Sequence, residues 1–219
     1  MRAVTARLAK RSVLAGALIS IGALFSIAAR DYGPVVQGMC FSVGLFGVLC
    51  CKADLFTGSM LLIRSVWDDD GQMSGLVRRW AGIWSGNLVG ALCVALMACL
   101  MGFDASASAC AKAALPWHEL LVRAVMCNVM VCMAVHIANN ADPFCIDPAM
   151  RLASCVLPVA CFVACGFEHS VADMLYMPLG LMGGAVTVAD CARVIGLATV
   201  GNVVGGIAFA WLVWEGGVE

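Results

Sequence analysis

Two short polar stretches interrupt a chain that is otherwise almost entirely apolar. Residues 166–173 include Glu168 and His169, and residues 54–59 include Thr57. An imidazole can donate a hydrogen bond or a proton near neutral pH, because its ordinary pKa lies close to that range. Ionisable groups at membrane depth are costly, and paired interruptions of apolar segments are typical of a solute site near the bilayer midplane. The two stretches therefore predict a central polar site in a membrane protein.

The composition supports this class. Apolar residues make up 63% of the chain and charged residues 12%, and the mean hydropathy is +0.96, which excludes an ordinary water-soluble domain. The net charge is −1, so the strongly basic surface that a nucleic-acid partner requires is missing. The 13 cysteines form no CxxC pair, and we interpret them as reduced apolar side chains rather than as disulfides or metal ligands. We expect no cofactor and no metal.

The polar stretches lie within long apolar spans, and the expected fold is an all-α membrane protein with six transmembrane spans. The second and fifth spans are longer than one straight helix needs to cross a bilayer, and each excess contains a polar interruption. We expect each to be broken into two half-helices around a loop that is buried in protein or lines a cavity. The predicted spans are residues 13–29, 35–66, 80–101, 120–138, 152–178 and 194–214.

The basic residues predict the orientation of these spans. An N-terminal secretion signal is the alternative for the first span, but five further spans favour a membrane-crossing helix. With the N-terminus inside, most Lys and Arg residues fall on the inner side, so both termini are expected to be cytoplasmic in a multi-pass protein of the inner or plasma membrane. The inner residues are Arg2, Arg7, Lys10, Arg11, Arg64, Arg78, Arg79 and Arg151, and the outer ones are Arg30, Lys112 and Arg193.

A repeated motif divides the chain into two similar halves. Residues 85–91 (SGNLVGA) resemble residues 200–206 (VGNVVGG), and each motif lies in the span that follows a broken span. We interpret the chain, residues 1–219, as a single channel domain with repeats over about 13–101 and 120–214. Three spans per half require opposite topologies. The glycines favour close helix packing, whereas Asn87 and Asn202 need polar partners, such as the loops.

Five ordered stretches resemble the formate/nitrite transporter family from about Val13 to Trp214. The most specific is GFEHSVA at residues 166–172, followed by Met174 and Pro178. The others are Leu55-Phe56-Thr57, Cys127-Asn128, residues 131–135 (VCMAV) and Gly201-Asn202. The resemblance implies an aquaporin-like fold in the lipid bilayer and a homopentamer with one pore in each protomer. It also implies passage of formate, nitrite, hydrosulfide or similar small monovalent anions, and leaves open whether protons accompany them.

The resemblance also implies roles for individual residues. His169 is similar to the central pore histidine of the family, Thr57 to the threonine on the opposing loop, and Glu168 and Asn202 to the polar supports of the loop. Arg123 occupies the region of a basic residue that is commonly lysine. The chain departs from the family pattern at Asp173, where asparagine is usual, and at Lys52, where glycine is common. The residues similar to those that narrow the pore are Phe41, Leu45, Leu55, Phe56 and Phe162.

An anion that crosses an apolar constriction loses hydration, and a histidine at its centre can offset that loss by donating a hydrogen bond or a proton. The alternative for His169 is a buried neutral ring that only bonds its loop. For Glu168 we favour a structural role, because a bare carboxylate would repel anions. Lys52 lies near one helical face with Phe41 and Leu45 if the helix continues that far. It either attracts anions or biases selectivity, or it pairs with Asp54 or extends toward a subunit interface.

Three other interpretations are open at this point. Arg123 either draws anions inward or pairs with Glu119, four residues away. A neutral-solute channel is the alternative function within the same class. A membrane redox subunit that binds haem through His118, His136 and His169 is less favoured, because no facing pair of histidines is evident. We expect no enzyme activity, because no catalytic triad or metal-ligand spacing is present.

Overall fold

The computed structural model describes residues 2–68, 72–140 and 148–214, and over these residues it consists of helices and their connections. Four helices are long and apolar enough to cross a membrane, over Thr5–Ala28, Met73–Leu100, Trp117–Asn139 and Val188–Leu212. The helices in chain order are α1 (Arg2–Ala28), η1 (Arg30–Tyr32), α2 (Pro34–Cys50), η2 (Gly58–Ile63), α3 (Arg64–Asp68), α4 (Met73–Leu100), α5 (Ser106–Ala114), α6 (Trp117–Asn140), α7 (Pro148–Ala164), α8 (Ser170–Met182) and α9 (Val188–Leu212).

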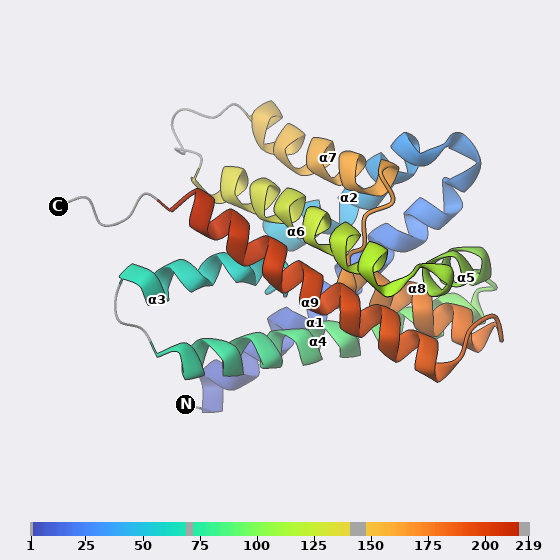
Figure 1. Ribbon diagram of the computed structural model, residues 1–219, viewed down its shortest axis with the longest axis horizontal. Helices are drawn as coiled ribbons and strands as arrows, with labels where there is room; N and C mark the ends of the chain where they lie inside the picture. Colours follow the sequence, from blue (N-terminus) through green and yellow to red (C-terminus); the bar gives the residue numbers. More distant parts are fainter. Residues whose placement is uncertain (1, 69–71, 141–147, 215–219) are drawn as a thin grey trace.

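The long helices run along the longest axis of the molecule (Figure 1). The start of α1, the end of α9 and α3 lie at one end, at the left of the view, and α5 lies at the other. At the left end, Trp214 Nε1 donates to Asp68 Oδ1 at 2.7 Å, and the Trp67 and Trp214 rings are 5.3 Å apart. These contacts tie the end of α9 to α3.

Two helix pairs, α1 with α4 and α6 with α9, pack through the glycines of the repeated motif. A Cβ atom on Gly90 of α4 would lie 2.0 Å from the Val13 carbonyl oxygen of α1. A Cβ atom on Gly205 of α9 would lie 2.1 Å from the Val125 carbonyl oxygen of α6. Only glycine allows backbones to approach this closely. The same motif therefore makes the same kind of helix contact in both halves of the chain.

The second predicted span is interrupted by a non-helical segment. α2 ends at Cys50, residues 51–57 form turns and irregular backbone, and Lys52 has a φ of 50° in the left-handed region. After this loop the chain continues as the 3₁₀ helix η2 and then the single turn of α3. A 3₁₀ helix has poorer hydrogen-bond geometry than an α-helix, which keeps such segments short.

The fifth predicted span contains a sharper interruption. α7 ends at Ala164, Gly166 adopts a φ of 65° in the left-handed region, and α8 begins at Ser170. His169 is the N-cap residue of α8, and its Nδ1 atom accepts the backbone N–H of Ala172 at 3.1 Å. An imidazole acceptor here satisfies one of the free N–H groups that every helix start leaves unpaired.

Helix α5 lies between α4 and α6, in a segment that the sequence analysis treated only as an outer connection. At its start, the Asp104 carboxylate accepts the backbone N–H of Ser106 at 2.8 Å, and hydrogen bonds from Ser106 lower the pKa of Asp104. At its end, Arg193 of α9 donates to the carbonyl oxygen of Leu115 at 3.0 Å. The helix packs on α8 and carries Lys112, which becomes part of the site described below.

Candidate functional site

Thr57 and His169 meet at the centre of the buried core, although 112 residues separate them in the sequence. The Thr57 Oγ1 atom lies 3.1 Å from His169 Nε2, and both side chains are buried. Because His169 Nδ1 accepts a backbone N–H, a neutral ring must carry its proton on Nε2. The Nε2–H group then donates to the threonine hydroxyl. The site therefore contains a hydrogen-bond donor held in an apolar environment.

Asn202 of α9 fixes the loop that carries His169. Its amide oxygen accepts the backbone N–H of Ser170 at 2.8 Å. Its amide nitrogen donates to the carbonyl oxygens of Glu168 at 2.9 Å and of Ala124 at 2.7 Å. The buried amide thus connects both neighbours of His169 to helix α6.

Asn87 of α4 holds the loop before Thr57 with the same set of bonds. Its amide oxygen accepts the backbone N–H of Phe56 at 2.8 Å. Its amide nitrogen donates to the carbonyl oxygens of Asp54 at 3.0 Å and of Ser12 at 2.7 Å. Both asparagines therefore make the polar contacts with the loops that the sequence analysis considered.

Asn128 of α6 joins the loop that carries Thr57 to helix α9, which the sequence analysis did not predict. Its amide nitrogen donates to the carbonyl oxygen of Thr57 at 3.2 Å and to that of Asn202 at 2.5 Å. The Cys132 thiol also lies 3.5 Å from the Thr57 carbonyl oxygen. The sequence contained a signal for this role, because Asn128 is an amide within an apolar span and needs polar partners.

Two phenylalanines cover the ring of His169. The Phe162 ring stacks on it with centroids 5.8 Å apart and an angle of 13° between the planes. Phe41 contacts it edge-on at 6.3 Å, and the two phenylalanine rings are 5.6 Å apart. Leu45 and Phe56 are buried in the same apolar core. Of the predicted constriction residues, Phe41 and Phe162 therefore contact the imidazole, and Leu55 lines a cavity described below.

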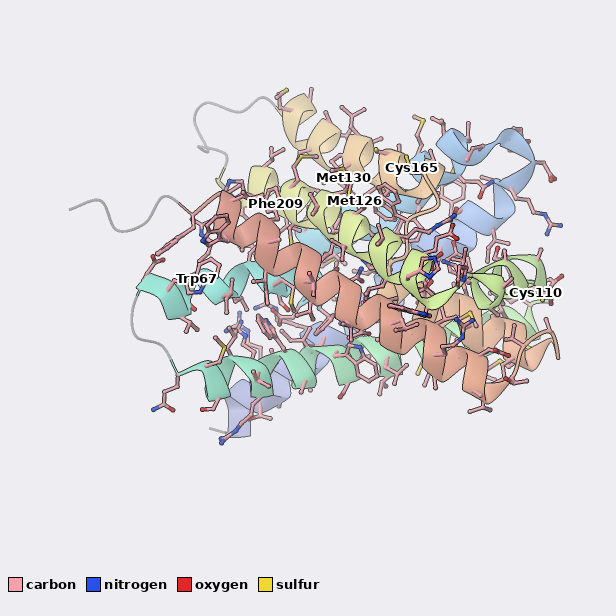
Figure 2. The ribbon with its side chains drawn as sticks, in the orientation of Figure 1. Trp67, Cys110, Met126, Met130, Cys165 and Phe209 are labelled. Atoms are coloured by element: carbon pink, nitrogen blue, oxygen red, sulfur yellow. The ribbon has the colours of Figure 1, made fainter. Side chains whose placement is uncertain are left out.

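A cavity of about 290 Å³, which we name the outer cavity from the expected orientation, lies beside the two phenylalanines that cover His169. Its lining includes Phe41, Phe162, Lys112, Arg123 and Glu168. It lies at the α5 end of the molecule, where Figure 2 labels Cys110, and away from Trp67 at the opposite end. Because Phe41 and Phe162 line this cavity and also contact the imidazole, they separate the cavity from the ring.

A second cavity of about 820 Å³, which we name the inner cavity in the same way, lies beside the residues that surround Thr57 in the chain. It is lined by Leu55 and Gly58, which lie two residues before and one residue after Thr57, and by the basic residues Arg11, Lys52 and Arg79. Neither cavity, as formed by the described residues, reaches Thr57 or His169. The Thr57–His169 contact therefore lies between two hollows.

Lys112 of α5 forms a buried ion cluster beside the histidine loop. Its Nζ atom lies 2.6 Å from Glu168 Oε2 and 2.9 Å from Asp173 Oδ1, and it also lies 5.4 Å from the centre of the Tyr176 ring. Glu168 thus pairs within the protein, in line with its expected structural role. The sequence analysis named Lys112 only as an outer basic residue and gave it no place in the site, although it is the lone basic residue within 102–116.

Arg123, which the sequence analysis assigned to this region, makes different contacts. Its Nη2 atom pairs with Glu119, and its Nη1 atom donates to the carbonyl oxygen of Gly166 at 3.1 Å. The side chain is 34% exposed and lines the outer cavity. The pairing with Glu119 is therefore present, while Lys112 is the cation that contacts Glu168.

Lys52 lines the inner cavity, but its predicted helical register is wrong. The sequence analysis placed it on one helical face with Phe41 and Leu45, whereas α2 ends two residues earlier, at Cys50. Asp54 also does not hold Lys52, because its Oδ2 atom pairs with Arg11 Nε at 3.2 Å. Lys52 is exposed and lines the cavity from the start of the loop.

The three histidines lie in separate aromatic contacts. The His118 ring lies 5.7 Å from that of Trp117, and the His136 ring lies 6.0 Å from that of Phe209. His169 contacts Phe41 and Phe162 instead. Among the described residues no group of three potential ligands could hold a metal ion.

The chain is similar to known transport proteins over nearly its whole length. The family model described as "Formate/nitrite transporter" matches residues 1–215. A "Probable formate transporter" from Methanothermobacter thermautotrophicus is 34% identical over 239 residues, which cover 93% of this chain and 86% of that protein. "Formate channel FocA" from Escherichia coli K12 is 33% identical over 189 residues, which cover 78% of this chain and 65% of that protein.

A solved structure gives the same result for the fold. The "Pentameric formate channel with formate bound" superposes with a TM-score of 0.84 and is 25% identical in sequence. The match covers 98% of this chain and 99% of that chain. The observed helical arrangement is therefore shared with a solved channel along the whole length of the chain.

Proposed function

The chain belongs to the formate/nitrite transporter family, and from this membership we propose that each protomer passes small monovalent anions such as formate, nitrite or hydrosulfide across a membrane. The observation that carries this proposal is the Thr57–His169 contact, which lies between an outer and an inner cavity. A polar contact in this position is suited to a solute that must cross an apolar barrier.

The apolar barrier limits the size of the solute. The polar site behind it must compensate for the hydration that the solute loses. An anion from the outer cavity passes between Phe41 and Phe162 and loses hydration there, which is costly for an isolated charge. The Nε2–H group of His169 then donates to the anion instead of to Thr57, so a bond already present in the protein is exchanged rather than created. The freed threonine hydroxyl can donate to the same anion.

The capping bond of His169 supports hydrogen-bond donation by a neutral ring. An imidazolium would carry a second N–H group at Nδ1, directed at the N–H of Ala172. Protonation would therefore remove the cap of α8 and place two donors against each other. Donation from Nε2 needs no such rearrangement, whereas complete proton transfer from the neutral ring would leave a far less stable anion.

The proposed architecture is six crossings arranged as two inverted halves, with a pore in each protomer of a homopentamer. The matching bonds of Asn87 and Asn202 support the two halves, and the pentameric solved relative supports the assembly. The basic residues of the inner flanks support cytoplasmic termini in the cell membrane. Within this pore we assign Leu45, Leu55 and Phe56 to the apolar barrier and Lys52 and Arg123 to its two entrances.

An anion panel in proteoliposomes tests the function. Purified protein should admit formate, nitrite and hydrosulfide faster than protein-free liposomes do, and it should not accelerate swelling in glycerol. Uptake of glycerol without uptake of any of these anions would overturn the proposal and favour a neutral-solute channel. A purified protein with a Soret band would instead indicate a haem protein.

A further inference from the structure

We propose that Glu168 and Asp173 together bind one exchangeable proton beside Lys112, and that this proton controls how readily anions enter the outer cavity. The inference rests on the proposed function, because it concerns access to the same pathway. The site is separate from the Thr57–His169 contact and lies where α5 packs against α8.

The geometry places two acids on one base in a buried position. Lys112 Nζ lies 2.6 Å from a Glu168 carboxylate oxygen and 2.9 Å from an Asp173 carboxylate oxygen. The three side chains are 16%, 4% and 0% exposed, in the order Lys112, Glu168 and Asp173. With all three groups ionised the cluster carries a net charge of −1. A net charge removed from water is strongly disfavoured unless a further partner neutralises it.

One carboxylate oxygen of Asp173 lacks a hydrogen-bond donor in the part of the chain that the structure describes. The Oδ2 atom is buried and has no hydrogen-bond partner among the described residues. Glu168 and Asp173 both contact the same ammonium group, and two ionised carboxylates offer no hydrogen to share. A single proton on this pair supplies the donor and also brings the cluster to neutrality. Two carboxylic acids that share one site commonly hold one proton in this way.

The uncharged ionisable residues around the two carboxylates do not release a proton near neutral pH. The Tyr176 ring of α8 lies 5.4 Å from Lys112 Nζ, and the Cys127 side chain of α6 is buried. A phenol and a thiol are ordinarily protonated at pH 7. His169 adjoins Glu168 in the chain, but its two ring nitrogens face Ala172 and Thr57.

The charged neighbours have other partners. Arg123 of α6 pairs with Glu119, and Arg193 of α9 donates to the carbonyl oxygens of Ala113 and Leu115 at the end of α5. Residues 80–100 of α4 include no charged side chain. Among the described residues that surround the two carboxylates, Lys112 is therefore the one cation in contact with them.

The proton changes the charge that an entering anion meets. Lys112 and Glu168 both line the outer cavity, so the cluster acts on that space directly. When the proton leaves, the wall becomes negative and repels anions, and when it binds, the wall is neutral. One unit of charge about 10 Å away, at an effective dielectric of about 20, changes the occupancy of an anion roughly tenfold.

Formate uptake into proteoliposomes tests the effect on transport. The initial rate is measured for the full-length protein with the inner pH held constant and the outer pH varied between about 5 and 8. Asp173→Asn keeps the shape of the side chain and leaves one carboxylate to balance Lys112. The share of formic acid varies with pH in the same way for every variant, so the informative quantity is the ratio of the variant rate to the wild-type rate.

We expect this ratio to be near one at the acidic end and roughly tenfold at the alkaline end. Asp104→Asn is the matched control, because Asp104 is an exposed aspartate at the same end of the molecule, and its ratio should stay constant. A constant ratio for Asp173→Asn would overturn the proposal. Absence of formate uptake by the wild-type protein would instead contradict the proposed function.

Infrared difference spectroscopy tests the proton itself and needs no transport. Exposed carboxyl groups ordinarily titrate below about pH 5, so a carboxyl carbonyl band that appears between about pH 8 and pH 5 must come from a buried acid. We expect this band in the wild-type protein and its loss in Asp173→Asn. If that variant does not fold, the wild-type spectrum still decides, because absence of the band would show that no exchangeable proton is bound.

Discussion

Asn87 and Asn202 hold the two irregular loops in the same way. Each amide oxygen accepts a loop N–H group, and each amide nitrogen donates to the loop carbonyl two residues earlier. The residue between the two bonded positions is Leu55 in the first loop and His169 in the second. The backbones of the two loops are therefore anchored in the same way. The position that His169 occupies in the second loop is occupied by the apolar residue Leu55 in the first. Thr57, two residues beyond Leu55, supplies the polar group that meets it.

Replacing Asn202 should destabilise the protein. In Asn202→Leu the N–H of Ser170 and the carbonyl of Glu168 would lose their partner, at a cost of about 1–3 kcal/mol for each buried group. We expect a clear fall in the melting temperature of the purified protein. Asn139→Leu, the same change at an exposed position, is the control and should leave it nearly unchanged. Equal stability of the two variants would contradict the anchoring role.

Removing the imidazole should slow anion passage. His169→Phe deletes the Nε2–H donor, and a hydrogen bond to a charged group is worth about 1.5–3 kcal/mol, so formate uptake should fall about 10- to 100-fold. Stopped-flow uptake in proteoliposomes measures this rate. His118→Phe, which alters a histidine packed on Trp117, should retain the wild-type rate and pH profile. Unchanged flux in His169→Phe would remove the central role of this residue.

The hydroxyl of Thr57 should matter more than its methyl group. Thr57→Val keeps the shape but leaves the Nε2–H group of His169 without its acceptor, whereas Thr57→Ser retains the hydroxyl. We expect several-fold slower formate uptake in Thr57→Val and near wild-type uptake in Thr57→Ser, measured at one pH in the same liposomes. Similar rates for the two variants would mean that the hydroxyl does not contact the anion.

Lys52 should affect anion entry from the inner cavity through its charge. Lys52→Met should slow uptake from that side several-fold at low ionic strength and have little effect at high salt, because exposed charges are screened. Flux measured over a salt series checks this. Lys10→Met removes an exposed lysine that does not line the cavity and should show no such dependence. A salt-independent effect in Lys52→Met would indicate altered packing of the loop.

The glycine contacts between helices should tolerate no side chain. In Gly205→Ala the new Cβ atom would lie 2.1 Å from the Val125 carbonyl oxygen, and the helices would have to separate at a cost of about 1–3 kcal/mol. Gly196→Ala, on the same helix α9, would meet open space and is the matched control. We expect a lower melting temperature for Gly205→Ala alone. Equal melting temperatures would show that α6 and α9 pack less closely than the structure indicates.

The amino-acid sequence alone determined the class of protein and the positions of the polar interruptions. Hydropathy is a property of contiguous residues, so the long helices could be located, although α1 begins at Arg2 and not at Val13, and α4 at Met73 and not at Trp80. The interruptions at Thr57 and His169 were visible because each lies in an apolar span of excess length. The ordered motifs around them indicated the family, because several short matches in one order rarely occur by chance.

Tertiary structure decided which polar groups meet. Lys112 lies 56 residues before Glu168, in a connection that the sequence did not predict as a helix, and only the packing of α5 on α8 brings the two together. Asp54 pairs with Arg11 rather than with the nearby Lys52, because α2 ends before Lys52 and the chain turns. Burial makes each such contact strong, and burial depends on segments that are distant in the sequence. The charge of the outer cavity is therefore set by the assembled fold.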